Sequence, residues 1–139
     1  MKVRPCFVMF FLCLIVFLLY FQVVSFSFID YDDNLYLLDN YPLQEGLNLR
    51  TIRWAFVDFH TGHWHPLTWL SHLLDWSLFG GWAGGHHLIN VLFHLADISL
   101  LFLFLVRFTG EWGKSFFVAA LFALHPVNVE SVAWVAERK

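Results

Sequence analysis

Three apolar runs divide the chain. The first extends from about residue 6 to 28, the second from about 87 to 108, and a shorter one from about 115 to 126. About 20 consecutive apolar residues span a bilayer, so the first two runs predict transmembrane helices. The third run is short for a full span. It either continues as a broken helix toward Trp134 or ends early among other helices.

The segment from about 29 to 86, between the two long runs, is too long to be structureless in a compact protein. Pro66 suits the first turn of a helix, and Gly80-Gly81 ends it. Gly84-Gly85 then leads into the second long run. Tryptophans are spread along this region and favour the headgroup zone of a bilayer. Leucines on one helical face follow Pro66, which predicts a helix on the membrane surface: Leu67, Leu70, Leu73, Leu74 and Leu78.

The charges on either side of the long runs predict the orientation. The segment between them holds seven acidic residues against Arg50 and Arg53, whereas basic residues elsewhere mark the cytoplasmic side. We therefore expect a multi-pass integral membrane protein with this segment external: periplasmic on a bacterial inner membrane, or lumenal in a eukaryotic endoplasmic reticulum. The residues that mark the cytoplasmic side are Lys2, Arg4, Arg107 and Lys114.

Composition agrees with a membrane location. Of the 139 residues, 59% are apolar and 14% charged, with a mean hydropathy of +0.62. A soluble domain is nearer half apolar and a quarter charged. The net charge of -3 and the lack of a basic stripe argue against nucleic acid. Ser25-Phe26-Ser27 is a poor cleavage site and the first run exceeds a signal-peptide core, so an uncleaved helix is favoured.

These patterns predict an all-α membrane protein: a multi-span helical bundle with a long external loop that carries membrane-surface helices. The expected parts are a span at about 6–28, the loop at 29–86, a span at 87–108, a third apolar segment at 115–126 and an external segment at 127–139. Three spans with a polar face do not make a self-sufficient bundle. We expect the chain to be the amino-terminal part of a larger membrane domain.

The acidic pair Asp32-Asp33 follows the first run and is expected at the lipid–water boundary. There a carboxylate can meet a water-soluble hydroxyl on one side and a lipid-borne group on the other. Two adjacent acids repel, and partial burial raises the pKa of a carboxyl toward that of a general base. A solvated turn after a helix is the competing interpretation.

A polar stripe follows one face of the second run, at His87, Asn90, His94 and Asp97. Ionisable residues inside a span are functional candidates. Hydrogen bonds between helices are the alternative, which we favour for Asn90 and Asp97. His87, near the external end, is the better site candidate.

A second candidate region follows the third run, where His125 precedes a proline at a helix end. Backbone exposed in this way is tolerated in a membrane only where protein or water covers it. Glu130 supplies charge only a few residues later. The cluster His60, His63 and His65 resembles a metal site in residue type, but its spacing fits no known zinc signature. Histidines that hydrogen-bond or contact phosphate are therefore favoured over a metal site, and no metal-ligating residue is assigned.

Several ordered blocks together resemble a known family. They resemble the membrane part of transmembrane and tetratricopeptide-repeat-containing proteins and their bacterial relatives, which are GT-C type glycosyltransferases related to protein O-mannosyltransferases. The resemblance covers nearly the whole chain from about Phe28. The blocks are YDDNLY at 31–36, WHPLTWLSH at 64–72, GHHLIN at 85–90 and FALHPVNVESVAWVAERK at 122–139.

The resemblance implies transfer of a sugar from a polyprenyl- or dolichyl-phosphate donor to a hydroxyl acceptor, often a serine or threonine of a secreted protein. It implies that Asp32 serves the acceptor with Asp33 as its neighbour, and that His125, Pro126 and Glu130 belong to the site. No cofactor is expected besides the lipid-linked donor, and a role for a divalent cation stays open. Expected substrate- or phosphate-binding residues are Arg53, His65, His87, His125, Glu130 and Arg138.

Two other classes of function stay open. The chain could be a non-enzymatic membrane anchor or interaction module for a repeat protein. It could also be a metal- or haem-binding membrane protein that uses His60, His63, His65 and His94. The partners expected for the transferase are membrane lipid, the lipid-linked sugar, and an acceptor protein or glycan.

Overall fold

The computed structural model describes residues 5–59 and 62–138, and the regular elements of these residues are helical. The elements in chain order are α1 (Pro5–Tyr20), η1 (Phe21–Ser25), η2 (Asn34–Leu38), α2 (Tyr41–Gln44), α3 (Leu49–Val57), α4 (Pro66–Phe79), α5 (Ala83–Thr109), α6 (Trp112–Leu124), α7 (Asn128–Ala133) and η4 (Val135–Arg138). Lys2, Arg4, His60 and Lys139 lie outside the described residues. The expected all-helical class is thus confirmed for the described part of the chain.

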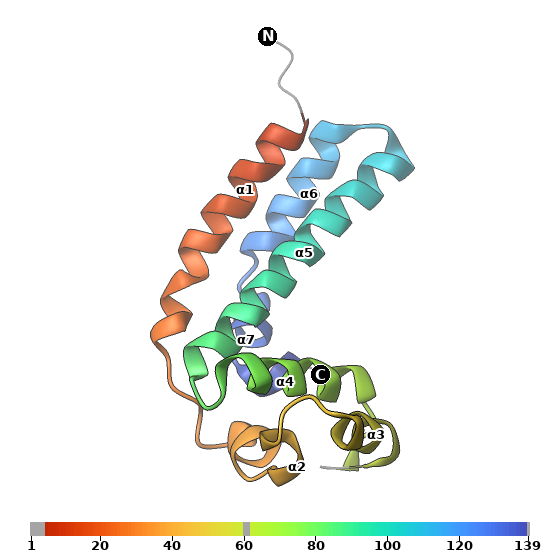
Figure 1. Cartoon of the computed structure of the whole chain (residues 1–139). Helices are drawn as coiled ribbons and strands as arrows, with labels where there is room; N and C mark the ends of the chain where they lie inside the picture. Colours follow the sequence, from red (N-terminus) through yellow and green to blue (C-terminus); the bar gives the residue numbers. More distant parts are fainter. Residues whose placement is uncertain (1–4, 60–61, 139) are drawn as a thin grey trace.

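Three helices, α1, α5 and α6, lie side by side and form a bundle (Figure 1). Their facing sides share one apolar core, in which Val16, Val91, Ile98, Ala119 and Ala123 are fully buried. Alanines on α6 allow it to approach the longer α5 closely. Gly110 takes a left-handed conformation (φ 72°) and ends α5, so that α6 turns back beside it.

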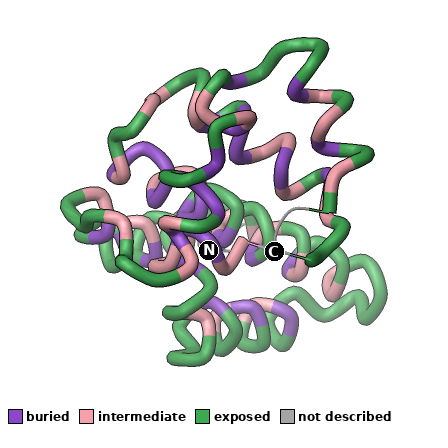
Figure 2. The backbone as a smooth tube through the Cα atoms, turned by 90° about the horizontal axis from the view of Figure 1, so that it is seen from below, coloured by how far each residue is buried: buried purple, intermediate pink, exposed green. Residues whose placement is uncertain are grey.

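The outward faces of the bundle are apolar. The most apolar 18-residue stretches of Pro5–Ser25 and Ala83–Thr109 have mean hydropathies of 2.8 and 2.2, and both segments are long and apolar enough to cross a membrane. Only 28% of the most apolar part of each is buried, and exposed residues cover much of the bundle surface (Figure 2). A core helix of a soluble protein would bury most of such a surface. Exposure of this kind favours lipid as the surrounding medium.

A second layer crosses one end of the bundle. Helix α4 lies across this end, and α2 and α3 lie beyond it (Figure 1). This layer has its own core, which includes Leu37, Leu43, Trp69, Leu73 and Val135. The residue Val135 shows that the carboxyl-terminal η4 packs into this layer. Segments from both halves of the chain therefore pack together in this layer.

Local signals explain where α4 begins and ends. Pro66 occupies its first turn, and Gly80 ends it with a φ of 55°, as the sequence predicts. The five leucines on one face of α4, however, are not equally exposed. Leu67, Leu74 and Leu78 are exposed, whereas Leu73 is fully buried. Leu73 lies at the edge of the leucine face, next to the buried side that Trp69, His72 and Asp75 form.

Other elements differ from their expected bounds. Helix α5 begins at Ala83, four residues before the expected start of the second run, so Gly84 and Gly85 lie inside its first turn. A Cβ on Gly84 would lie 2.3 Å from the carbonyl oxygen of Val24. The two backbone segments approach each other so closely that only glycine fits at this position. Helix α6 starts at Trp112 and ends at Leu124; His125-Pro126 then separates it from α7. The third apolar segment is therefore a broken helix.

Candidate functional site

Asp33 joins the segment after the first long helix to the carboxyl-terminal end of the described chain. Its side chain is fully buried. Oδ2 accepts a hydrogen bond from the Ile29 N–H at 2.9 Å, and Oδ1 accepts one from the Ala136 N–H at 2.9 Å. The second bond connects residues 103 positions apart. Two of the blocks that carry the family resemblance are therefore in direct contact.

Asp32 precedes this buried carboxylate but has a different environment, because its side chain is only partly buried. Its neighbour Tyr31 is exposed and packs against Trp134, with ring centroids 5.9 Å apart. On the other side, Tyr36 is buried and stacks on Trp69 at 5.3 Å. Of the two adjacent acids, Asp33 is therefore buried and connects two segments, whereas Asp32 is more accessible.

Arg138 is held by residues from α4 and α5. Its Nη1 donates to Asp75 Oδ2 at 2.5 Å and to Ser71 Oγ at 3.2 Å, and its Nε donates to Asn90 Oδ1 at 2.6 Å. Its Nη2 donates to the His86 carbonyl oxygen at 3.1 Å. The guanidinium also lies 5.4 Å from the ring centroid of Phe93, within the range of a cation–π interaction.

The Arg138–Asp75 pair is an ion pair with 8% and 2% of the two side chains exposed. Burial raises the pKa of the Asp75 carboxyl, and the positive charge and hydrogen bond of Arg138 oppose that shift. Burial likewise lowers the pKa of the Arg138 guanidinium, and Asp75 opposes it. Burial lowers the pKa of His72 well below its ordinary value, and Arg138 lowers it further. His72 is therefore neutral beside the ion pair.

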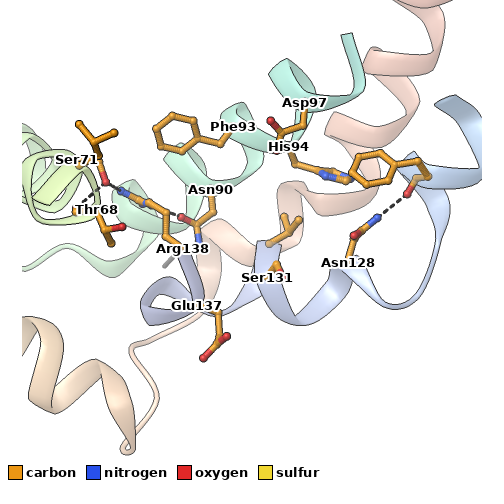
Figure 3. A pocket seen from close by; sticks show the side chains of 13 residues that line it. Thr68, Ser71, Asn90, Phe93, His94, Asp97, Asn128, Ser131, Glu137 and Arg138 are labelled. Atoms are coloured by element: carbon orange, nitrogen blue, oxygen red, sulfur yellow. Dashed lines mark hydrogen bonds between the residues drawn. The ribbon is translucent and has the colours of Figure 1, made fainter. Parts of the chain in front are cut away.

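A pocket of about 480 Å³ opens next to Arg138 (Figure 3). Its polar wall includes Ser71, Asn90 and Arg138, and its apolar wall includes Leu67 and Phe93. Helix α5 contributes residues from Asn90 to Asp97, so the pocket runs along a helix long enough to cross a membrane. Such a pocket suits a ligand with a polar group and an apolar part.

The predicted site residues do not all meet at this pocket. Arg138 lines it, whereas Asp32, Asp33, Arg53, His65, His87, His125 and Glu130 are absent from its lining. Consecutive residues of η4 nevertheless connect the two regions. The Ala136 N–H binds Asp33, and the next two residues, Glu137 and Arg138, line the pocket. The acidic pair and the pocket are therefore neighbours across η4.

The remaining predicted residues occupy different places. His87 is buried at the start of α5, against Phe26 at 6.2 Å between ring centroids. His65 immediately precedes α4 and packs on Trp69 at 4.8 Å. Arg53 is exposed on α3. His125 is exposed and accepts a hydrogen bond from the Val127 N–H, and Glu130 is exposed in the first turn of α7.

Two residues of the polar stripe of α5, Asn90 and His94, connect this helix to other segments, as expected for Asn90. Its Nδ2 donates to the Trp134 carbonyl oxygen at 3.0 Å while its Oδ1 accepts from Arg138. His94 Nε2 contacts the Ala123 carbonyl oxygen at 3.1 Å. Asp97 differs from this expectation, because it is exposed and faces the pocket (Figure 3).

Sequence reasoning missed the buried polar residues of α4. His72 and Asp75 lie three residues apart inside a leucine-rich helix and are both buried. A charged residue on the apolar side of a helix rarely stays unpaired, and that signal was available in the sequence. Its partner Arg138 lies 63 residues away, and no local pattern identifies it. Of the predicted histidine cluster, His63 is exposed and its ring lies 6.1 Å from His65.

Comparison with known proteins found relatives of one kind. The chain is 31% identical over 136 residues to protein O-mannosyl-transferase Tmtc2 of Drosophila melanogaster, covering 92% of this chain. It is 31% identical to Tmtc1 of Drosophila melanogaster and to TMTC3 of Mus musculus, covering 88% and 78% of this chain. The chain spans only 14%, 15% and 12% of these relatives. Neither a protein-family model nor a solved structure matches the chain.

Proposed function

We propose that this chain, a distant homologue of the TMTC protein O-mannosyl-transferases over most of its length, contributes the acceptor-activating part of a membrane glycosyltransferase. The reaction would transfer a sugar from a polyprenyl- or dolichyl-phosphate to a hydroxyl group, with inversion at the anomeric carbon. Serine or threonine of a secreted protein is the acceptor that fits the relatives' name.

The observation that carries this proposal is the hydrogen bond between Asp33 and the Ala136 N–H. It joins the acidic segment after the first apolar helix to the segment that holds Arg138. The buried Asp33 fixes the backbone around Asp32, so the more accessible carboxylate is kept near the outer end of the helices. A general base needs a fixed position within hydrogen-bond reach of its substrate.

In the proposed reaction the acceptor hydroxyl attacks the anomeric carbon from the face opposite the phosphate. Asp32 accepts the hydroxyl proton as the new carbon–oxygen bond forms and the bond to the phosphate oxygen breaks. The transition state resembles the oxocarbenium ion of glycoside hydrolysis. The lipid phosphate leaves as an anion and needs no proton, so one carboxylate base suffices.

The leaving phosphate needs cationic or hydrogen-bonding groups aimed at its oxygens. Arg138 is the best-placed of the predicted candidates because it lines the pocket. Its four hydrogen bonds use four of the five N–H groups of a guanidinium, which leaves one for a ligand. The apolar wall of the pocket suits an isoprenoid chain. Exposed Arg53, His125 and Glu130 have no comparable place there.

The test is transfer from a radiolabelled polyprenyl-phosphate sugar by the full-length protein. General-base catalysis is worth about 10²–10⁴ in rate, so Asp32→Asn should lower turnover by that factor while thermal unfolding is unchanged. Asp39→Asn is the matched control, because Asp39 is exposed and follows η2 in the same segment. Transfer by Asp32→Asn at the rate of the Asp39 control would remove Asp32 from the role.

A further inference from the structure

Three metal-ligating side chains from two helices meet in a buried cluster next to Arg138. His72 and Asp75 come from α4, and His86 comes from the first turn of α5. One ligand atom from each lies within 4.8 Å of the other two, and at most 1% of each residue is exposed. We propose that His72, Asp75 and His86 bind a divalent transition-metal ion, with zinc as the expected occupant.

The hydrogen bond of His86 favours the tautomer that a metal ligand needs. Its Nε2 lies 2.8 Å from the carbonyl oxygen of Gly80, and only a protonated ring nitrogen donates to a carbonyl. In a neutral imidazole, Nδ1 then keeps its lone pair. Nδ1 lies 3.8 Å from Asp75 Oδ2. Metal-bound histidines commonly donate their other N–H to a backbone carbonyl in this way.

His72 is the second observation that points to a ligand. It is fully buried, and among the described residues neither of its ring nitrogens has a hydrogen-bond partner. Buried polar side chains in folded proteins are nearly always hydrogen-bonded. A metal ion between His72, Asp75 and His86 would bind the lone pair of one His72 nitrogen, so that one of the two ring nitrogens would gain a partner.

Arg138 does not exclude a metal ion. It binds Asp75 through Oδ2, but a carboxylate has about four lone-pair sites and can accept a hydrogen bond while it ligates a metal. Arg138 is also held by Asn90, Ser71 and the His86 carbonyl oxygen.

Two imidazoles and one carboxylate are a ligand set that zinc accepts, with a fourth position left for another ligand. An ion at this place would join the middle of α4 to the start of α5. It would thereby fix the angle between the layer that crosses the bundle and the bundle itself. This role does not depend on sugar transfer, and metal content can be measured directly.

The experiment measures zinc in the purified full-length chain by mass spectrometry and follows Co²⁺ binding by visible absorption. We expect about one zinc per chain, and a Co²⁺ band that added zinc abolishes, as for a site that takes zinc in preference to cobalt. His72→Gln and His86→Gln should each weaken zinc binding at least tenfold, a loss in the range known even for outer-shell changes. His63→Gln is the control, since His63 is an exposed histidine outside the cluster.

Each outcome decides the proposal. Loss of zinc in the His72 and His86 variants but not in His63→Gln would support it. Absence of both zinc and the Co²⁺ band in the unmodified chain would overturn it, and this result does not depend on any variant folding. Zinc kept by His72→Gln but lost in His63→Gln would also overturn it, because the metal would then belong to the loop between α3 and α4.

Discussion

Asp33 offers a direct test of how the two ends of the chain are held together. The change Asp33→Ala removes the acceptor of two hydrogen bonds, from the Ile29 and Ala136 N–H groups, each 2.9 Å long. A buried donor left without a partner costs about 1–3 kcal/mol, so two such donors predict a loss of about 2–6 kcal/mol. Asp33→Ala also removes the cost of burying a carboxylate, so we expect the loss of stability to lie near the lower end of this range.

Thermal unfolding in detergent and amide hydrogen exchange together measure this effect. Asp33→Ala should lower the unfolding temperature and should speed exchange at Ala136, whose N–H loses its acceptor. Asp39→Ala is the control, because Asp39 is exposed in the same segment. Asp33→Asn keeps one acceptor oxygen and should fall between the two. An Asp33→Ala variant as stable as the Asp39 control, with Ala136 exchange unchanged, would refute the reasoning.

Two further predictions concern the packing around α5. Gly84→Ala places a Cβ 2.3 Å from the Val24 carbonyl oxygen, and this overpacking should lower the free energy of unfolding by about 1–3 kcal/mol. The control is Gly113→Ala in α6, where a Cβ would have nothing within 4 Å. That change should be neutral or should stabilise the protein by about 0.5–1 kcal/mol. Equal effects of the two in thermal unfolding would contradict the close approach. In the metal-free protein, Arg138→Met leaves the buried Asp75 carboxylate without the guanidinium and should cost about 3–5 kcal/mol. Combining Arg138→Met with Asp75→Leu should recover part of that cost. A double variant no more stable than Arg138→Met would show that the Asp75 charge is not the cause.

Local signals explain which helices the sequence could predict. Pro66 and Gly80 mark α4, and the long apolar run marks α5, because each signal lies within or beside its own helix. The short elements η2 and α2 carry too few residues for a periodic pattern. Even so, Asn48 caps α3 and exchanges hydrogen bonds with Thr51, a pairing that the sequence could have indicated.

The site was less predictable because its contacts are long-range. Asp32-Asp33 stood out by its position after an apolar run, but nothing nearby in sequence shows that Asp33 is buried against Ala136. Arg138 was predicted as a phosphate ligand, yet its environment depends on Asp75, 63 residues away. The His72, Asp75 and His86 cluster requires the angle at which α4 meets α5. That angle comes from core packing and from the close approach of Gly85 to Phe79 at the end of α4, which hydrophobic patterns do not specify.

The adjacent acids make it possible to separate loss of chemistry from loss of fold. Asp33 holds two backbone segments, so its removal should reduce stability and sugar transfer together. Asp32 is more accessible, so Asp32→Asn should reduce transfer with unfolding unchanged. If both variants lost transfer and stability in parallel, the acidic pair would act only through the fold, and the proposed base would have to be sought elsewhere. Loss of transfer with unchanged stability in Asp32→Asn, beside loss of both in the Asp33 variant, is the result that assigns the proton transfer to Asp32.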